Sequence, residues 1–299
     1  MIAVDWGTSS LRAYRLDDRG DVIDKRRGND GALASTGRFG EVLAALLQGW
    51  DDTTVVMCGM VGARGGWIEV PYVACPAGAE ALAAGMLELD PATIGTDALA
   101  ARSLWCAAGM VDHQRQAADV MRGEETQVLA LLDLLGPGAH RVCLPGTHSK
   151  WVDVGDGRIN GVTTAMTGEV YGLLRRHSIL ARGLPEDEAP LDEGAFDAGV
   201  AEAGDDGLLH DVFGVRTAAL FGRFEPVALP SYLSGLLIGH ELRAALHGIP
   251  AGEVHLLGSD ALLQRYARAL QALGHAVVRH REDLAASGCH RLACLRGLA

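Results

Sequence analysis

Two short stretches of the sequence combine glycine with hydroxyl side chains in the same order. Residues 5–10 read DWGTSS after an apolar start, and residues 144–149 read LPGTHS after another apolar run. Glycine at the tip of a tight turn lets backbone N–H groups approach an anion, and neighbouring hydroxyls add donors. Two such turns could hold a polyphosphate from both sides, although ordinary hairpins also use glycine and serine.

Asp5 distinguishes the first stretch from the second, because Leu144 stands at the matching place before Gly146. A magnesium ion that also binds phosphates needs only one or two carboxylates from the protein. The alternative is a simple turn residue, but the end of an apolar run is a costly place for an uncompensated charge. Asp5 is therefore the candidate magnesium ligand.

A pair of acids, Glu124 and Glu125, follows Gly123 at the start of a helical pattern. Adjacent side chains on a helix point in different directions, so at most one of the two can serve a given site. Acids in the first turn also interact favourably with the helix dipole. That structural role is the alternative to a catalytic one.

Two further stretches have the composition of binding loops. The glycine-rich loop 59–72 carries Arg64, Trp67 and Tyr72, which could line a sugar-like pocket or simply pack on the surface. Residues 256–270 read as a strand, a Gly-Ser turn and a helix, a junction where nucleotides often bind, although many α/β crossovers look the same. Neither the P-loop motif nor a G-x-G-x-x-G after a strand occurs, so those two nucleotide-binding folds lack their motifs.

The bulk properties limit the function classes. The 299 residues carry a net charge of −12, which argues against general affinity for nucleic acid or anionic membranes. The six cysteines form no C-x-x-C pair, so we expect buried, reduced thiols. No apolar stretch reaches the 18 residues of a membrane span, and Asp5 interrupts the first apolar run. We therefore expect a cytoplasmic protein whose partner is a small molecule, with homo-oligomerisation left open.

The predicted elements occur as strands followed by helices, twice, which indicates an α/β protein. Gly136-Pro137-Gly138 ends a helix and separates two related halves, residues 1–137 and 138–299. The strands are predicted at 2–7, 11–18, 22–28, 54–60, 103–109, 140–146, 150–158, 161–167, 254–258 and 275–280. The helices are predicted at 41–50, 78–89, 124–135 and, approximately, 168–180, 191–203, 230–247 and 259–273.

Seven stretches in the same order resemble one known family. They are DWGTSSLRAY, VVMCGMVGARGGWIEVPYV, VMRGEETQ, LPGTHSKWV, AMTGEVYGLL with the following HSIL, YLSGLLIGHE and GSDALLQRY. The sequence resembles the 2-dehydro-3-deoxygalactonokinase family of the actin/hexokinase/Hsp70-like ATPase superfamily over nearly its whole length. The resemblance implies two ribonuclease-H-like domains with ATP in the interdomain cleft.

The resemblance also implies a role for each half. Residues 1–137 would supply the first phosphate hairpin, the sugar-acid pocket and the catalytic acid, and residues 138–299 the second hairpin and an adenosine-binding turn. Related carbohydrate kinases have G-D-Q-Q where this chain has Gly123-Glu124-Glu125-Thr126, so Glu124 is the predicted base and Glu125 the reserve. ATP and Mg2+ contacts are expected at Asp5, Gly7, Thr8, Ser9, Ser10, Gly146, Thr147, His148, Gly258 and Ser259. Sugar-acid contacts are expected at Arg12, Gly59, Met60, Arg64, Trp67, Tyr72 and Arg122.

The implied reaction converts ATP and 2-dehydro-3-deoxy-D-galactonate into the 6-phosphate and ADP, as part of galactonate catabolism. In-line positioning and charge neutralisation are what such a transfer requires. One alternative is a kinase of the same fold that acts on another 2-keto-3-deoxy sugar acid, such as the gluconate epimer. The other is a nucleotide or sugar sensor that keeps the fold without catalysis.

Overall fold

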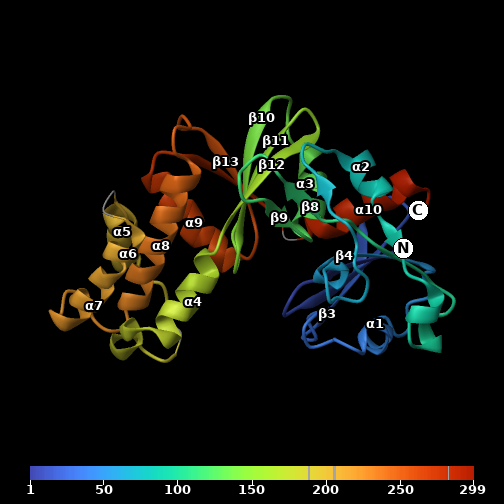
Figure 1. Ribbon diagram of the computed structural model, residues 1–299, viewed down its shortest axis with the longest axis horizontal. Helices are drawn as coiled ribbons and strands as arrows, with labels where there is room; N and C mark the ends of the chain where they lie inside the picture. The colour runs from blue at the N-terminus through green and yellow to red at the C-terminus, as the bar shows by residue number, and fades with distance from the viewer. Residues whose placement is uncertain (188, 205–206, 282) are drawn as a thin grey trace. The chain divides into compact units, whose positions relative to one another are not determined.

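The computed structural model describes residues 1–187, 189–204, 207–281 and 283–299 (Figure 1). The chain forms two compact units. The first unit comprises Met1–His140, Val152–Thr163 and Arg281–Ala299, and the second unit comprises Arg141–Trp151 and Thr164–His280. The sequence predicted one division, between residues 137 and 138. In the structure two later segments of the chain also pack with the first unit.

The first sheet has the strand order β3-β2-β1-β4-β7-β6. Strand β2 pairs antiparallel with both β3 and β1, whereas β1, β4 and β7 are parallel, and β6 pairs antiparallel with β7. Almost every side chain of β1 and β4 is buried, as expected for parallel strands with both faces covered. The strands are β1 (Ile2–Trp6), β2 (Leu11–Leu16), β3 (Val22–Gly28), β4 (Thr54–Gly59), β6 (Leu87–Glu88) and β7 (Ser103–Cys106).

The second sheet has the strand order β12-β11-β10-β13-β14, with β10, β13 and β14 parallel. Both sheets therefore share the order third, second, first, fourth over their first four strands, and the first sheet continues with its sixth and fifth strands while the second continues with its fifth. This repeated order agrees with the repeated pattern in the sequence, and the predicted α/β class is confirmed. The strands are β10 (Ala139–Leu144), β11 (Ser149–Gly155), β12 (Arg158–Ala165), β13 (Glu253–Leu257) and β14 (Ala276–His280).

The C-terminal helix α10 (Leu284–Arg296) completes the first unit. It packs against α2, α3, β1 and β4 (Figure 1). A small third sheet has the order β5-β8-β9. The remaining elements of this unit are α1 (Phe39–Leu46), α2 (Ala79–Ala84), α3 (Glu124–Leu132), β5 (Val73–Ala74), β8 (Met110–Asp112), β9 (Asp119–Met121) and the 3-10 turns η1 (Met60–Gly62), η2 (Pro91–Thr93) and η3 (Asp97–Leu99).

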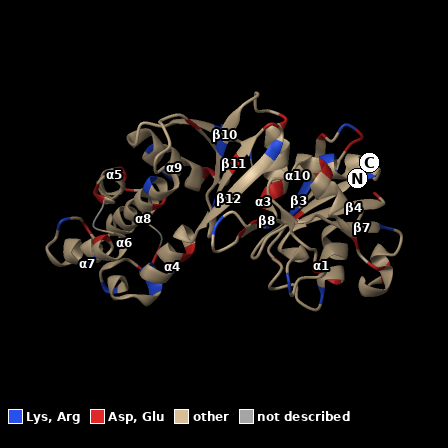
Figure 2. Ribbon diagram, turned by 45° about the horizontal axis from the view of Figure 1, so that its top comes forward, with Lys and Arg blue, Asp and Glu red and all other residues tan. Residues whose placement is uncertain are grey.

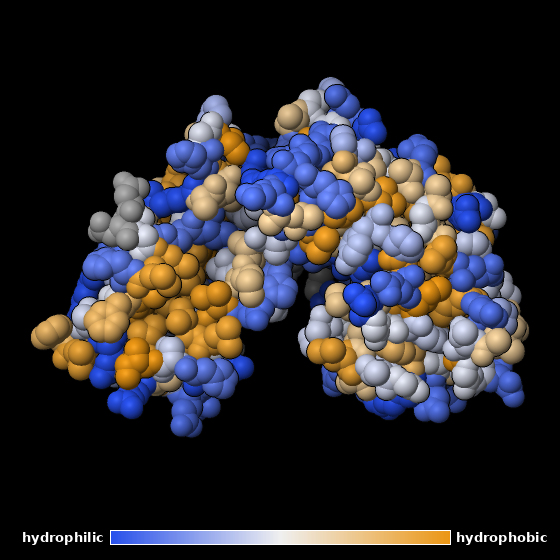
Figure 3. Space-filling view, viewed as in Figure 1, coloured by the Kyte–Doolittle hydropathy of each residue, from blue (hydrophilic) through white to orange (hydrophobic). Residues whose placement is uncertain are grey.

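The second unit is mainly helical around α8, which is buried along most of its length. Figure 3 shows an apolar area on this unit. The exposed large hydrophobic side chains of the unit include those of Phe213 and Leu220 in α7. No helix in the described part of the chain is long and apolar enough to cross a membrane. The helices are α4 (Thr167–His177), η4 (Ile179–Gly183), α5 (Glu193–Glu202), α6 (Leu208–Asp211), α7 (Phe213–Leu220), α8 (Leu229–Ala245) and α9 (Asp260–Ala272).

One predicted helix, 78–89, is shorter in the structure. It ends at Ala84, and Leu87–Glu88 instead form β6, which pairs with β7. Gly85 follows the helix at a crowded position, where a Cβ would lie 2.9 Å from the Val73 side chain. Helix propensity was overridden by a strand pairing between residues far apart in the chain.

Candidate active site

The first predicted phosphate hairpin joins β1 to β2 and packs against loop 29–35. The Gly7 carbonyl accepts a hydrogen bond from the Ala32 N–H at 2.9 Å. Gly31 lies so close that a Cβ there would come within 2.3 Å of the Thr8 carbonyl oxygen. The hairpin backbone is therefore held in place by its neighbour. The exposed hairpin side chains are those of Thr8, Ser9 and Ser10.

Asp5 lies near the carboxyl end of β1, paired in register with Arg12 of β2 and Cys58 of β4. Its Oδ2 lies 3.5 Å from Nη1 of Arg12, and 19% of its side chain is exposed. The described residues contain no cluster of three or more His, Cys, Asp or Glu that could hold a metal alone. A partly accessible carboxylate beside a hairpin nevertheless fits magnesium whose remaining ligands are phosphate oxygens and water.

Two glycines fix the start of α3 near the carboxyl ends of β1 and β4. Gly59 ends β4 with φ of 95°, and a Cβ there would lie 2.6 Å from the Trp6 carbonyl oxygen. Gly123 precedes α3 with φ of 108°, and its Cβ would lie 3.0 Å from the Gly59 Cα. Both positions favour glycine by conformation and by space. They bring the start of α3, which carries Glu124, to the carboxyl ends of β1 and β4, where Asp5 lies.

Glu125 is completely buried, and its two carboxylate oxygens accept hydrogen bonds from the Gly123 N–H at 2.9 and 2.7 Å. Burial, followed by the charge of Glu124, raises the pKa of the Glu125 carboxyl from 4.5 to about 8. Desolvation disfavours the charged form of a carboxyl group, which explains the direction. Glu125 therefore holds the backbone at the start of the helix.

Glu124 is partly exposed, unlike its neighbour. Its Oε2 accepts a hydrogen bond from the backbone N–H of Arg122 at 2.9 Å. Figure 2 shows the acidic start of α3 in red. Of the two acids, Glu124 is the one that a substrate hydroxyl could reach.

Arg122 connects the start of α3 to the loop after β4. Its Nη2 donates to the Val70 carbonyl at 2.7 Å, and its guanidinium lies 4.2 Å from the centre of the Tyr72 ring. The side chain is only 9% exposed, and Nε and Nη1 have no hydrogen-bond partner among the described residues. Arg122 therefore positions loop 59–72 from within the protein.

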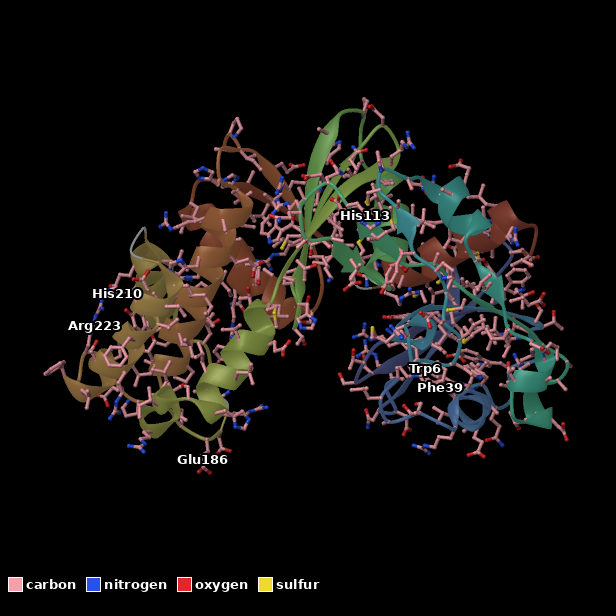
Figure 4. All side chains as sticks on the ribbon, in the orientation of Figure 1. Trp6, Phe39, His113, Glu186, His210 and Arg223 are labelled. Atoms are coloured by element: carbon pink, nitrogen blue, oxygen red, sulfur yellow. The ribbon has the colours of Figure 1, made fainter. Side chains whose placement is uncertain are left out.

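Trp67 belongs to an aromatic cluster with Trp6 and Phe39. Its ring stacks on Phe39 at 5.8 Å and meets Trp6 edge-on at 6.2 Å between centroids. Figure 4 shows Trp6 and Phe39 next to each other, and their ring centroids are 5.4 Å apart. The Trp67 ring is thus packed, whereas Met60 and Arg64 of the same loop are exposed.

The second predicted phosphate hairpin, between β10 and β11, contacts a buried polar network. Ser149 Oγ lies 2.8 Å from the Tyr266 hydroxyl, which donates to Glu241 at 2.6 Å. Trp151 Nε1 donates to the other Glu241 oxygen at 2.8 Å. Burial raises the pKa of Glu241, although these hydrogen bonds oppose the shift. The Gly146 N–H points to Ser149 Oγ at 3.5 Å, so the network reaches the hairpin itself.

The start of α4 lies against the same hairpin. A Cβ on Gly168 would come within 2.5 Å of the Gly146 carbonyl oxygen, so the two backbones are in contact. The Glu169 N–H donates to the Thr147 carbonyl at 3.0 Å, and the Glu169 carboxylate pairs with the His148 ring. Thr147 and His148 are exposed. The start of α4 therefore positions the hairpin.

The predicted adenosine turn lies beside this hairpin within the second unit. A Cβ on Gly258, which has φ of 154°, would lie 3.4 Å from the Pro145 carbonyl oxygen. Ser259 precedes α9 without capping it through its hydroxyl. The second unit thus brings together its hairpin and the turn at 258–259.

Sequence reasoning did not identify Glu241 or Tyr266 as part of the site. Both lie within stretches that carry the family resemblance, but their meeting depends on how α8 packs on α9. The available signal was Glu241 itself, an acid in the apolar run YLSGLLIGHE. A buried acid in such a run needs hydrogen-bond donors, which Trp151 and Tyr266 provide.

Comparison with known proteins gives a consistent result. An Escherichia coli (strain K12) protein named 2-dehydro-3-deoxygalactonokinase is 34% identical over 280 residues, which cover 91% of this chain and 90% of that protein. A Rhizobium meliloti (strain 1021) relative named for the same activity is 36% identical over 281 residues, covering 91% of this chain and 89% of the relative.

Solved structures agree. A crystal structure of a Sinorhizobium meliloti protein given the same kinase name is 34% identical, with a TM-score of 0.88 over 98% of this chain and 97% of the other. The ADPNP-bound activator of 2-hydroxyisocaproyl-CoA dehydratase from Clostridium difficile shares the fold at 10% identity, with a TM-score of 0.53 over 99% of this chain and 96% of the activator. The family described as 2-keto-3-deoxy-galactonokinase matches residues 5–292. The chain therefore belongs to the 2-keto-3-deoxy-galactonokinase family.

Proposed function

We propose that this protein transfers the γ-phosphoryl group of ATP to the 6-hydroxyl of 2-dehydro-3-deoxy-D-galactonate, yielding the 6-phosphate and ADP in galactonate catabolism. The observation that carries the proposal is the repeated Gly-Thr-x-Ser hairpin, which follows the first strand of each of two sheets whose first four strands have the same order. The names of the relatives supply the substrate.

The two units correspond in this proposal to two ribonuclease-H-like domains with ATP bound between them. The roles of residues 1–137 and 138–299 follow the resemblance, with α10 added to the first domain. The first hairpin and the second hairpin would bind phosphates, and the turn at 258–259 would bind adenosine. Backbone N–H groups held by close glycine contacts suit this task, because preorganised donors need no rearrangement as charge develops.

Asp5 would hold Mg2+, in part through water. When bound, the ion neutralises charge on the phosphate oxygens. Arg12 lies beside this carboxylate and compensates its charge. Asp5 lies at the end of β1, next to a hairpin that loop 29–35 holds in place. This location would determine where the charge of the Mg2+ ion lies.

Glu124 would accept the proton of the 6-hydroxyl. Its partly exposed carboxylate is held by the Arg122 backbone N–H, while Glu125 fixes the start of the helix. A positioned base typically contributes about 10²- to 10⁴-fold in rate. The 6-hydroxyl is free only in the open-chain or furanose form of the sugar acid, because the pyranose ring is closed through that oxygen. The pocket must therefore accept one of those forms.

The test is an ADP-release assay with a panel of 2-keto-3-deoxy sugar acids. We expect the galactonate substrate to be turned over with the highest kcat/KM. Equal turnover of the gluconate epimer would contradict the galactonate specificity and indicate a kinase that accepts several 2-keto-3-deoxy sugar acids. Tight binding of nucleotide without any ADP release, with every acid in the panel, would favour a sensor.

A further inference from the structure

Three arginines of the first unit are candidates for the substrate carboxylate, and the structure gives them different surroundings. Arg12 lies 3.5 Å from Asp5, at the phosphate end of the site. Arg122 is nine-tenths buried, donates to the Val70 carbonyl and is covered by Tyr72. A ligand could reach the remaining Arg122 nitrogens only if this packing moved.

Arg64 differs from both. Its side chain is exposed and makes no hydrogen bond or ion pair with any described residue. It lines a pocket together with Thr8 of the first hairpin, Leu33 and Met60. Arg38 lines a different pocket, together with Gly66, and its guanidinium pairs with Asp30 at 2.6 Å. In a chain of net charge −12, Arg64 thus places an uncompensated cation beside the phosphate hairpin.

The turn that carries Arg64 is rigid. The Gly66 N–H donates to the Ala63 carbonyl at 2.8 Å, and the Trp67 N–H donates to the Val61 carbonyl at 2.9 Å. The stacking of Trp67 on Phe39 fixes the turn to the aromatic cluster that also contains Trp6, the residue after Asp5. The backbone that carries the Arg64 side chain is therefore held relative to the first hairpin, as a specificity site requires.

We propose that Arg64 binds the carboxylate of the sugar acid and thereby selects acids over neutral sugars. This inference rests on the proposed kinase function. The carboxylate and the 6-hydroxyl are at opposite ends of a six-carbon chain, so the carboxylate partner must be a different group from Asp5 and Glu124. A guanidinium can pair with a carboxylate through two parallel hydrogen bonds, which gives both affinity and orientation. Neither Arg12 nor Arg122 offers an accessible fork of that kind.

The test compares the natural substrate with its aldehyde analogue, in which CHO replaces the carboxylate. For the wild type, we expect a higher kcat/KM for the acid than for the aldehyde. Arg64→Ala should lower kcat/KM for the acid roughly 10- to 100-fold, the usual range for a hydrogen bond to a charged group. The aldehyde should be almost unaffected, and KM for ATP should not change. Arg64→Lys should lie between the wild type and Arg64→Ala, because it keeps the charge without the fork.

Arg115→Ala is the matched control, since Arg115 is also an exposed arginine of the first unit but does not line this pocket. It should leave the acid-to-aldehyde ratio unchanged. An unchanged ratio in Arg64→Ala, in a protein that phosphorylates the acid, would overturn the Arg64 assignment and leave the kinase function standing. An equal loss for both substrates would also overturn it. Absence of wild-type turnover with every sugar acid would overturn both.

Discussion

Glu124 and Glu125 are neighbours in the sequence, yet the structure places them in very different environments. Glu125 is fully buried against the Gly123 N–H, whereas Glu124 keeps an accessible carboxylate. The sequence alone predicted that only one of them could serve the site, because adjacent helix positions diverge. It left the choice to a family resemblance. Burial now provides a physical reason to prefer Glu124.

Glu124→Gln should therefore fold normally and bind ATP but lose most of its turnover, about 10²- to 10⁴-fold. Glutamine keeps the size and the acceptor for the Arg122 N–H but cannot take the proton. ADP release measures the turnover, and calorimetry measures ATP binding. Glu80→Gln, an exposed first-turn acid of α2, is the control and should behave as wild type. Full activity in Glu124→Gln would exclude it as the base.

Glu125 makes stability depend on pH. Its pKa is about 8 in the folded chain and 4.5 as a free group, so between these values the folded state holds a proton that the unfolded state has lost. Folding stability should thus fall as the pH rises through this window and become level above it.

Urea unfolding of the wild type and of Glu125→Gln at pH 5 and pH 9 measures this effect. The wild type should lose unfolding free energy relative to the variant when the pH is raised. Glutamine retains an acceptor for the Gly123 N–H and does not titrate. A difference between the two proteins that is independent of pH would contradict the expected titration of Glu125.

At the scale of elements, the sequence predicted the repeated strands well because their apolar runs are long and local. Strand β4, for example, was predicted at 54–60 and is observed at Thr54–Gly59. The short strands β8 and β9 escaped prediction because three residues carry no periodicity, and their pairing with each other and with β5 is decided by tertiary contacts. Helix α10 was missed as well. It contains Ser287 and Gly288, which lower local helix propensity.

Gly288 has a packing role that local propensity cannot reveal. It faces α3, where an added Cβ would lie only 1.9 Å from the Thr126 carbonyl oxygen. The glycine thus permits α10 to approach the backbone of the helix that carries Glu124. The site depends on a residue more than 160 positions away in the chain.

Gly288→Ala should displace α10 from α3, because the clash is with backbone and not with a flexible side chain. Overpacking of a core typically costs about 1–3 kcal/mol. Thermal unfolding should show the loss of stability, and the ADP assay should show reduced turnover because the start of α3 moves. Ser287→Ala, at the exposed neighbouring position, should change neither. Wild-type stability in Gly288→Ala would contradict the close packing.

At the scale of the whole molecule, the first unit is built from separate parts of the chain. Residues 152–163 and 281–299 complete it, so its core forms only after nearly the entire chain is available. Helix α10 buries apolar side chains against both sheet and helices, including Leu284, Cys289 and Leu292. A prediction from local pattern divides the chain once, because sequence periodicity does not reveal which core a distant helix joins.

Deletion of residues 284–299 should consequently unfold the first unit while the helices of the second unit remain. Four of the five tryptophans, Trp6, Trp50, Trp67 and Trp105, belong to the first unit, so intrinsic fluorescence reports mainly on it. We expect a red-shifted spectrum without a cooperative urea transition, together with substantial helical circular dichroism. Removal of the exposed Ala299 alone is the control and should preserve the transition. A wild-type unfolding midpoint in the longer deletion would show that α10 is not part of the core of the first unit. The first unit would then remain folded although the apolar side chains of α3, β1 and β4 that α10 covers were exposed to water.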